Sequence, residues 1–196
     1  EIQFGGVIYS DSADKATRFI ANCNQRKIPL VFLQDVTGFM VGSDAEHGGI
    51  IKDGAKMVNA VSNSIVPKFT IIIGNSYGAG NYAMCGKAFD PRFIVSWPTA
   101  KIAVMGGEQA GNVLLQIQKS AAKKKGEKVD TQKEEQLLNE IKEKYDAQTT
   151  PTYAAARMWL DAVIDPTNTR KWISMGLALA DHAPIEKKFS MGILQV

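Results

Sequence analysis

Apolar and polar positions follow two periodicities along this chain, in an order typical of βαβ units. Continuous apolar runs predict short buried strands at 4–9, 30–33, 69–73, 92–97 and 101–105. Apolar residues at helical spacing predict helices at 15–23 and 50–64, and short loops join these elements. Strands that alternate with helices favour a parallel sheet with right-handed crossovers. The pattern predicts an α/β protein of one domain.

Individual side chains can be assigned to faces of these elements. The run Leu30–Leu33 contains no polar residue, so we expect this strand to be covered on both faces. Two helices each carry one apolar stripe that we expect to face the core. The stripes comprise Ala16, Phe19, Ile20 and Cys23 in the first helix, and Ile51, Ala55, Val58 and Val61 in the second.

The second half of the chain is more polar. A helix is expected from a glycine turn at 106–107 to about Gln118, followed by a charged linker at 119–128. The segment 131–147 predicts a surface helix, and docking of a partner is the alternative interpretation. Its apolar face would comprise Leu137, Leu138, Ile141 and Tyr145. Further elements are a helix at 151–158, a short strand at 162–166 and a last helix, capped by Thr167 or Asn168, that ends at Ala180.

Three loops follow strands, at 35–42, 74–80 and 104–108, and ligands of α/β folds bind at this edge of a sheet. At 74–80 a β-branched strand stops at small residues before a helix. Gly74, Gly78 and Gly80 permit positive φ and close approach to the backbone. The first amides of a helix lack internal partners, so the amides of Ala79 and Gly80 are candidates for an oxyanion hole. Tight packing of the strand against the helix is the alternative.

Composition and charge argue against several classes of function. The net charge of +3 and the interleaving of acids with bases argue against nucleic-acid binding. No apolar run reaches the ~18 residues of a membrane span. Cys23 and Cys85 lie in apolar patterns that predict buried, reduced thiols, which fits the cytoplasm or, in a eukaryote, the mitochondrial matrix. Of the two histidines, His47 is expected to have a capping or surface role and His182 to lie at the surface, and no His/Cys cluster has the spacing of a metal site.

The sequence therefore offers few side chains that are suited to catalysis. Without a histidine partner Ser76 is a poor candidate nucleophile. Glu108 is the best-placed acid, although stabilisation by the start of its helix explains it equally. Asp35 and Asp53 are most simply structural. Backbone electrophilic stabilisation remains, and it suits a reaction in which a cofactor carries the base.

Several segments together resemble the carboxyltransferase (β) subunits of biotin-dependent acyl-CoA carboxylases. They are, in chain order, 35–42 (DVTGFMVG), 52–57 (KDGAKM), 76–86 (SYGAGNYAMCG), 97–98 (WP), 104–110 (VMGGEQA), 163–166 (VIDP) and 169–170 (TR). The resemblance covers nearly the whole chain. The forms of the segments 76–86 and 104–110 are most similar to the methylcrotonoyl-CoA carboxylase type.

The resemblance implies a crotonase-like (ClpP/crotonase) fold of repeated ββα units. This chain matches the C-terminal of the two homologous halves of the family over 1–196, and we expect the N-terminal half to be absent from it. In the family the N half of one subunit holds the acyl-CoA and the C half of its neighbour holds carboxybiotin, usually within a larger ring such as a hexamer. We therefore expect the chain alone to have little or no activity.

The family's site residues transfer to matching positions. Ala79 and Gly80 would form the oxyanion hole for the ureido oxygen of biotin, and Gly38 and Phe39 would line the biotin side. Four residues of the glycine turns complete the candidate cofactor-binding set: Tyr77, Gly78, Gly106 and Gly107. The implied partners are a biotin carboxylase and biotin carrier subunit and further copies of the chain, with no metal in this domain. Neither Glu108 nor the charged segment 119–147 receives a role.

Two alternatives remain. A decarboxylase α subunit of the glutaconyl-CoA type would use the same oxyanion hole to transfer the carboxyl group to biotin. A non-catalytic assembly domain would use its surfaces only for oligomerisation. The sequence does not identify the acyl group, because its pocket would belong mostly to the other half of the family's fold.

Overall fold

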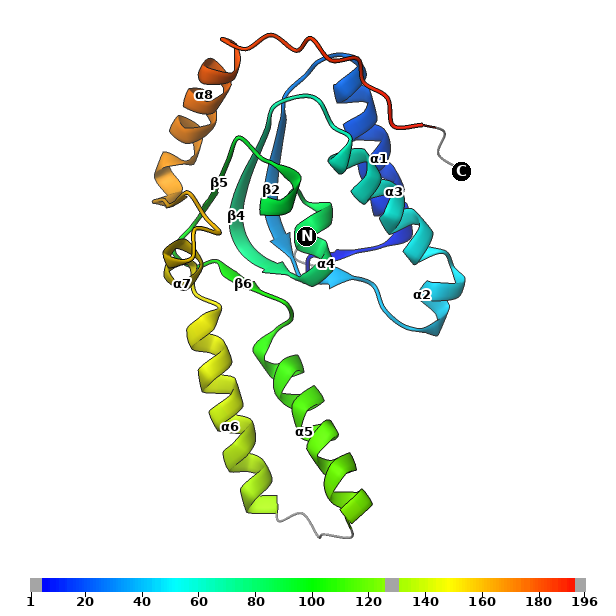
Figure 1. Cartoon of the computed structure of the whole chain (residues 1–196), viewed down its shortest axis with the longest axis vertical. Coiled ribbons are helices and arrows are strands. Elements are labelled where there is room, and N and C mark those ends of the chain that lie inside the picture. The colour runs from blue at the N-terminus through cyan, green and yellow to red at the C-terminus, as the bar shows by residue number, and fades with distance from the viewer. Residues whose placement is uncertain (1–4, 126–130, 193–196) are drawn as a thin grey trace.

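The structure, a computed structural model, describes residues 5–125 and 131–192 and has an α/β architecture (Figure 1). A parallel sheet has the strand order β2-β4-β5-β7, and β6 pairs with the second part of β4. A second, two-stranded parallel sheet joins β1 to β3. The strands are β1 (Val7–Ile8), β2 (Leu30–Val36), β3 (Gly38–Phe39), β4 (Lys68–Tyr77), β5 (Phe93–Ser96), β6 (Lys101–Ala103) and β7 (Ala162–Val163). The predicted α/β fold with parallel strands is confirmed.

Helices cover the two faces of the sheet unequally. The first and third helices pack on one face, where Ile20 and Val61 meet Leu30 and Phe32 of β2. The last helix lies on the opposite face. The longer helices are α1 (Ser10–Gln25), α3 (Ile50–Ser62), α5 (Gly107–Lys125), α6 (Thr131–Gln148) and α8 (Thr169–Ala180). The short ones are α2 (Ser43–His47), α4 (Gly78–Ala83), η1 (Lys87–Phe89), α7 (Pro151–Ala156) and η2 (Pro166–Asn168).

The expectation that β2 is covered on both faces is wrong. Its residues alternate between buried and exposed, and Val31 and Leu33 are 39% and 49% exposed. The covering helix on this side is α8, in which Trp172 packs against Phe93 with the ring centroids 5.6 Å apart. Since α8 follows β7, at the edge of the sheet opposite β2, it covers β4 and β5 and leaves β2 open.

The predicted helices exist, but their apolar stripes do not all face the core. In α3 the buried residues are Ile50, Gly54, Met57, Ala60 and Val61, whereas Ile51 is 72% exposed. Phe19 of α1 is likewise exposed. Helix α3 is apolar on two adjacent faces, and only one of them packs against the sheet. The other is open to solvent in this chain.

The predicted linker at 119–128 is also partly wrong. Helix α5 continues to Lys125, because the alanines and lysines of 119–125 favour helix, while 126–130 lie outside the described residues. The surface helix is confirmed as α6, and it packs along α5 as an arm that extends away from the sheet (Figure 1). Leu138 lies against Gly111, and the hydroxyl of Tyr145 accepts a hydrogen bond of 3.4 Å from the amide of Met105. We call α5 and α6 the helical arm.

Several smaller predictions are confirmed. Cys23 and Cys85 are buried free thiols, and burial raises the pKa of Cys85 to about 11. His47 and His182 are exposed. Asn168 occupies the N-cap position of α8, as one of the two predicted alternatives, but its side chain makes no cap hydrogen bond. Asp53 is structural: with Asp14 it holds Lys56, at Nζ–Oδ1 distances of 2.9 and 3.2 Å, and so ties α3 to α1.

Replacement of Gly176 by alanine tests how tightly α8 is packed. A Cβ atom there would lie 2.5 Å from Cε1 of Phe93 and 2.8 Å from Cε1 of Phe69. Alanine favours helix by about 1 kcal/mol over glycine, but overpacking costs about 1–3 kcal/mol. We expect Gly176→Ala to lower the free energy of unfolding in urea. Leu179→Ala, at a 65% exposed position of α8, is the control, with little change expected. Equal or greater stability of Gly176→Ala would contradict the packing.

The ion pair between Asp53 and Lys56 predicts a pH dependence. The hydrogen bond from Lys56 lowers the pKa of Asp53, and the same bond raises the pKa of Lys56. A carboxyl group whose pKa is lower in the folded than in the unfolded protein stabilises the fold at pH values above its unfolded pKa of about 3.9. This stabilisation is lost as the pH falls through the folded pKa. The contribution of Lys56 is present at neutral pH and is lost only above its usual pKa of 10.5.

Asp53→Asn should therefore reduce stability at pH 6–7 and lose this effect as the pH falls below about 4. Urea unfolding of the wild type and the variant across this range measures the difference. The matched control is Asp181→Asn, at the exposed C-cap of α8. A difference between wild type and Asp53→Asn that stays constant from pH 7 to pH 3 would show that the ion pair contributes nothing.

Candidate active site

The segment 70–86 is a strand that runs directly into a helix. Strand β4 continues to Tyr77 and α4 begins at Gly78, so the loop expected at 74–80 is not formed. Among Gly74, Gly78 and Gly80 only Gly78 has a positive φ, of 52°. A Cβ on Gly78 would also lie 2.8 Å from the carbonyl oxygen of Val104. The other two glycines permit close packing, not an unusual backbone conformation.

A β-bulge sets where β4 ends. Gln34 pairs with Ile72 and Val36 pairs with Ser76, so three residues of β4 lie opposite the single residue Asp35. The Asp35 carboxylate fills this bulge, where it lies against Gly74 and accepts a hydrogen bond of 2.9 Å from the amide of Asn75. The structural interpretation of Asp35 is therefore confirmed.

Helix α4 packs directly against the end of β2 and against β3. A Cβ on Gly80 would lie 2.6 Å from Cγ2 of Val36 and 3.3 Å from the Cα of Gly38. Pairing with β1 fixes β3, since the amide of Thr37 donates to Gly6 and that of Met40 to Ile8. The φ of 143° at Gly38 is one that glycine adopts readily. The structure thus brings Gly38 and Gly80 into contact, as the prediction of one site requires.

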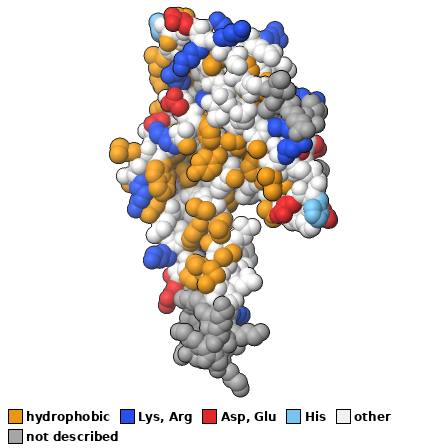
Figure 2. Space-filling model, turned by 45° about the vertical axis from the view of Figure 1, so that its right-hand side comes forward, with side chains coloured by type: hydrophobic (Ala, Val, Ile, Leu, Met, Phe, Trp, Pro, Cys, Tyr) orange, Lys and Arg blue, Asp and Glu red, His pale blue; other side chains and the backbone are white. Residues whose placement is uncertain are grey.

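An apolar groove of about 620 Å³ opens beside this contact, between β3 and α3. The ring of Phe39 forms one wall and lies against Gly54, where a Cβ would be 2.8 Å from its Cε1. Ala79 lies at the groove, as do the exposed apolar residues of α3. The remaining lining residues are Met40, Val41, Glu46, Ile50, Ile51, Ala55, Val58, Asn59 and Ser62. We call this the α3 groove. Figure 2 shows hydrophobic side chains gathered on one face of the molecule and along the arm.

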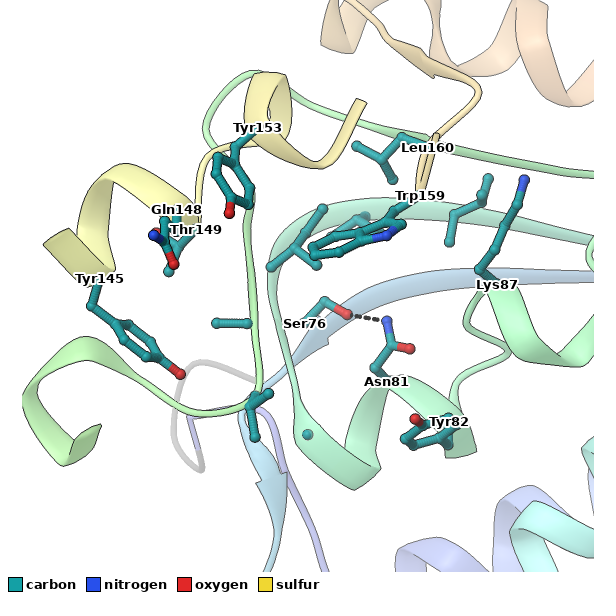
Figure 3. Close-up of a pocket in the computed structure, with 16 residues that line it drawn as sticks. Ser76, Asn81, Tyr82, Lys87, Tyr145, Gln148, Thr149, Tyr153, Trp159 and Leu160 are labelled. Carbon is teal, nitrogen blue, oxygen red and sulfur yellow. Dashed lines mark hydrogen bonds between the residues drawn. The ribbon is translucent and has the colours of Figure 1, made fainter. Parts of the chain in front are cut away.

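A second cavity of about 430 Å³ lies on the other side of α4, at the base of the helical arm (Figure 3). We call it the arm cavity. It is lined by Gly78, Val104 and a mixture of polar and aromatic side chains. These include Ser76, Asn81, Tyr82, Lys87, Tyr145, Gln148, Thr149, Tyr153 and Trp159. Lys87 at its rim pairs with Asp161 at 3.1 Å.

The remaining candidate residues lie apart from both cavities. Gly106 lies against Tyr77, and Gly107 lies close to the carboxylate of Asp146 in α6. Burial, followed by the charge of Asp146, raises the pKa of Tyr77, so its phenol stays neutral. The structure therefore brings Gly38, Phe39, Ala79 and Gly80 together at one place. Gly78 lines the arm cavity instead, and Tyr77, Gly106 and Gly107 lie at the base of the arm.

A buried polar chain beneath α4 was not foreseen from the sequence. The Nδ2 of Asn81 donates to Ser76 Oγ, whose hydroxyl donates to Oε1 of Gln34, each at 2.7 Å. The Nε2 of Gln34 donates to the carbonyl oxygen of Met84, also at 2.7 Å. Sequence reasoning considered Ser76 only as a nucleophile. The available signal was Gln34, a polar residue at an inward position of β2, on the same face as the apolar Leu30, Phe32 and Val36.

No three His, Cys, Asp or Glu side chains gather as a metal site within 5–125 and 131–192. Over the same residues no helix is both long and apolar enough to cross a membrane. The side chain of Glu108 lies outside the part of the chain that is described.

Comparison with known proteins gives consistent matches over most of the chain. Residues 1–191 match the model of the carboxyl transferase domain family. The chain is 52% identical to the probable mitochondrial methylcrotonoyl-CoA carboxylase beta chain of Drosophila melanogaster, over 95% of this chain and 32% of that protein. It is 50% identical to the biotin-dependent 3-methylcrotonyl-coenzyme A carboxylase beta1 subunit of Mycobacterium tuberculosis, over 93% of this chain and 34% of that subunit.

The crystal structure of the geranyl-CoA carboxylase beta subunit of P. aeruginosa superposes with a TM-score of 0.83 at 43% identity, over 96% of this chain and 36% of that one. The chain thus spans about a third of the length of the relatives that it matches. The crotonase fold is confirmed, and so is the similarity to the methylcrotonoyl-CoA carboxylase type. This chain belongs to the carboxyl transferase domain family.

Proposed function

We propose that this chain is the part of an acyl-CoA carboxylase β subunit that receives biotin during carboxyl transfer to an acyl-CoA. The observation that carries the proposal is the convergence of two backbone segments, Gly38–Phe39 and Ala79–Gly80, at one end of the α3 groove. Membership of the carboxyl transferase domain family supports it, as do relatives named as CoA carboxylase chains.

The α3 groove fits the chemistry of biotin. Its volume of about 620 Å³ is within the usual range for small-ligand sites. Phe39 and Ala79 offer apolar contacts for the ring system, and the first-turn amides of α4 offer donors to the ureido oxygen. When bound, biotin supplies the transferable carboxyl group and the base of the reaction. This chain would supply the pocket and the donors.

Because biotin would supply the carboxyl group and the base, the chain's own residues would act as hydrogen-bond donors and as walls of the pocket. Amides of Ala79 and Gly80 would donate to an oxygen that gains negative charge, and each fixed donor of this kind contributes about 3 kcal/mol to transition-state stabilisation. Phe39 would exclude water from one wall of the groove. Glu46 is the only ionisable residue among those that line the groove, so the chain offers little acid–base chemistry of its own there.

The open apolar surfaces favour a site that is completed by another part of the assembly. Ile51 is exposed beside the groove, and Val113, Leu114 and Ile117 are exposed on α5. We propose that the N half of a neighbouring subunit covers the site and brings the acyl-CoA, and that a hexamer and a biotin carboxylase and carrier subunit complete the enzyme. Named relatives that are carboxylase chains favour carboxylation over decarboxylation.

Removal of one backbone donor tests the site. Ala79→Pro lacks the amide hydrogen, and proline is tolerated in the first turn of a helix. In the full-length β subunit assembled with its biotin subunit, we expect carboxyl transfer to methylcrotonoyl-CoA to fall about 100–1,000-fold.

Ala79→Gly keeps the amide and is the matched control, with transfer expected near the wild-type rate. Size-exclusion chromatography checks that each variant assembles, and ATP-dependent carboxylation of biotin checks the other half-reaction. An assembled Ala79→Pro enzyme with an undiminished transfer rate would show that the amide of Ala79 is not a donor in the reaction. It would favour the alternative that this chain serves assembly alone.

A further inference from the structure

Helix α4 is too short to fix its own position. It has six residues, Gly78–Ala83, and so few internal hydrogen bonds that an isolated helix of this length is unstable. Its placement relative to β3 therefore depends on contacts with the rest of the fold. Those contacts decide where the amides of its first turn point.

One side chain of β2 reaches both ends of this helix. Gln34 accepts a hydrogen bond from Ser76, two residues before α4, and donates one to the carbonyl oxygen of Met84, the residue after it. Asn81, in the middle of α4, donates in turn to Ser76. Figure 3 shows this last bond, between the end of β4 and α4. Entry, middle and exit of the helix are thus joined to a single residue of a neighbouring strand.

The chain of bonds has one direction, so it fixes the orientation of each group. Asn81 Nδ2 donates to Ser76 Oγ, Ser76 Oγ donates to Gln34 Oε1, and Gln34 Nε2 donates to Met84. Gln34 and Ser76 are fully buried. Buried polar groups of this kind are costly to leave unpaired, so any displacement of α4 that breaks one bond is strongly opposed.

The same strand also contacts the first turn of α4 directly. Val36, on the same face of β2 as Gln34, is the residue against which Gly80 packs. Two successive inward residues of β2 therefore hold the helix, Val36 by contact and Gln34 by hydrogen bonds.

We infer that Gln34 is a positioning residue for carboxyl transfer. Through Ser76 and Met84 it holds α4 in the one placement that aims the amides of Ala79 and Gly80 at the α3 groove. Gln34 itself lines neither that groove nor the arm cavity, so it acts through the helix and not on a bound molecule. This inference rests on the function proposed above.

The test uses the full-length β subunit assembled with its biotin subunit, and it compares Gln34→Met with Asn24→Leu. Each variant replaces a fully buried amide by an apolar side chain of similar size. Asn24 bonds to Ser64 and to the amide of Ile65, away from α4, so its loss measures stability alone. Thermal unfolding, kcat and KM for the acyl-CoA are measured for both variants.

We expect both variants to unfold at lower temperature, and only Gln34→Met to lose transfer. Its kcat should fall about 10–100-fold with KM for the acyl-CoA unchanged. The reason is that displaced amides of Ala79 and Gly80 would slow the transfer step without affecting the binding of the acyl-CoA. Ser76→Ala should lose a similar factor, and the double variant should lose no more than either single one, because one break already frees the helix. An additive double variant would contradict the chain of bonds.

Amide hydrogen exchange separates this inference from the proposed function. The peptide that spans 77–84 should exchange faster in Gln34→Met than in Asn24→Leu, whether or not the enzyme transfers carboxyl groups. Unchanged exchange, or a wild-type kcat in a folded Gln34→Met enzyme, would overturn the positioning role. If Gln34→Met does not assemble, Ser76→Ala is judged by the same two measurements. A wild type without transfer, together with faster exchange in the variant, would reject the proposed function alone.

Discussion

The close approach of α4 to the ends of β2 and β3 is the contact on which the candidate site depends. Gly80 has no side chain to separate the helix from Val36 and Gly38, and a Cβ would come within 2.6 Å of the valine. Once the helix is this close, its first-turn amides lie beside the β3 backbone and the Phe39 wall of the groove. The bulge opposite Asp35 contributes to the same end, because it sets which residue of β4 lies opposite Val36.

The fold also leaves a large apolar surface uncovered. The outer face of β2, the second apolar face of α3 and one side of α5 all expose aliphatic side chains. Monomeric proteins rarely expose apolar patches of this extent, whereas subunits that bury them in an assembly commonly do. This chain belongs to the carboxyl transferase domain family and spans about a third of the length of the relatives that it matches, and its exposed apolar faces are of the kind that subunits of an assembly bury.

Local patterns in the sequence predicted the elements well, and tertiary contacts account for what they missed. Alternation and helical spacing identify the strands and helices, but the apolar stripe of α3 was assigned to the core although Ile51 faces the open groove. Periodicity measures how apolar a face is, not what covers it. Likewise the run Leu30–Leu33 is apolar on both sides, but α8 covers only β4 and β5, so the side of β2 that carries Val31 and Leu33 stays exposed in this chain.

The glycines of the segment 74–80 show the same distinction at the site. All three glycines permit positive φ and close approach, but only Gly78 adopts a positive φ. Gly74 and Gly80 are needed because Asp35 and Val36 occupy the space that a side chain would fill. Glycine signals that something comes close but not what it is. Gln34 is the converse case: this polar residue at an inward position of β2 has no visible partner in the sequence until β4 and α4 bring Ser76 and Met84 to it. The donors of such a site are backbone amides. Their orientation is set by the residues that pack around them, so the residue types that carry the amides say little about it.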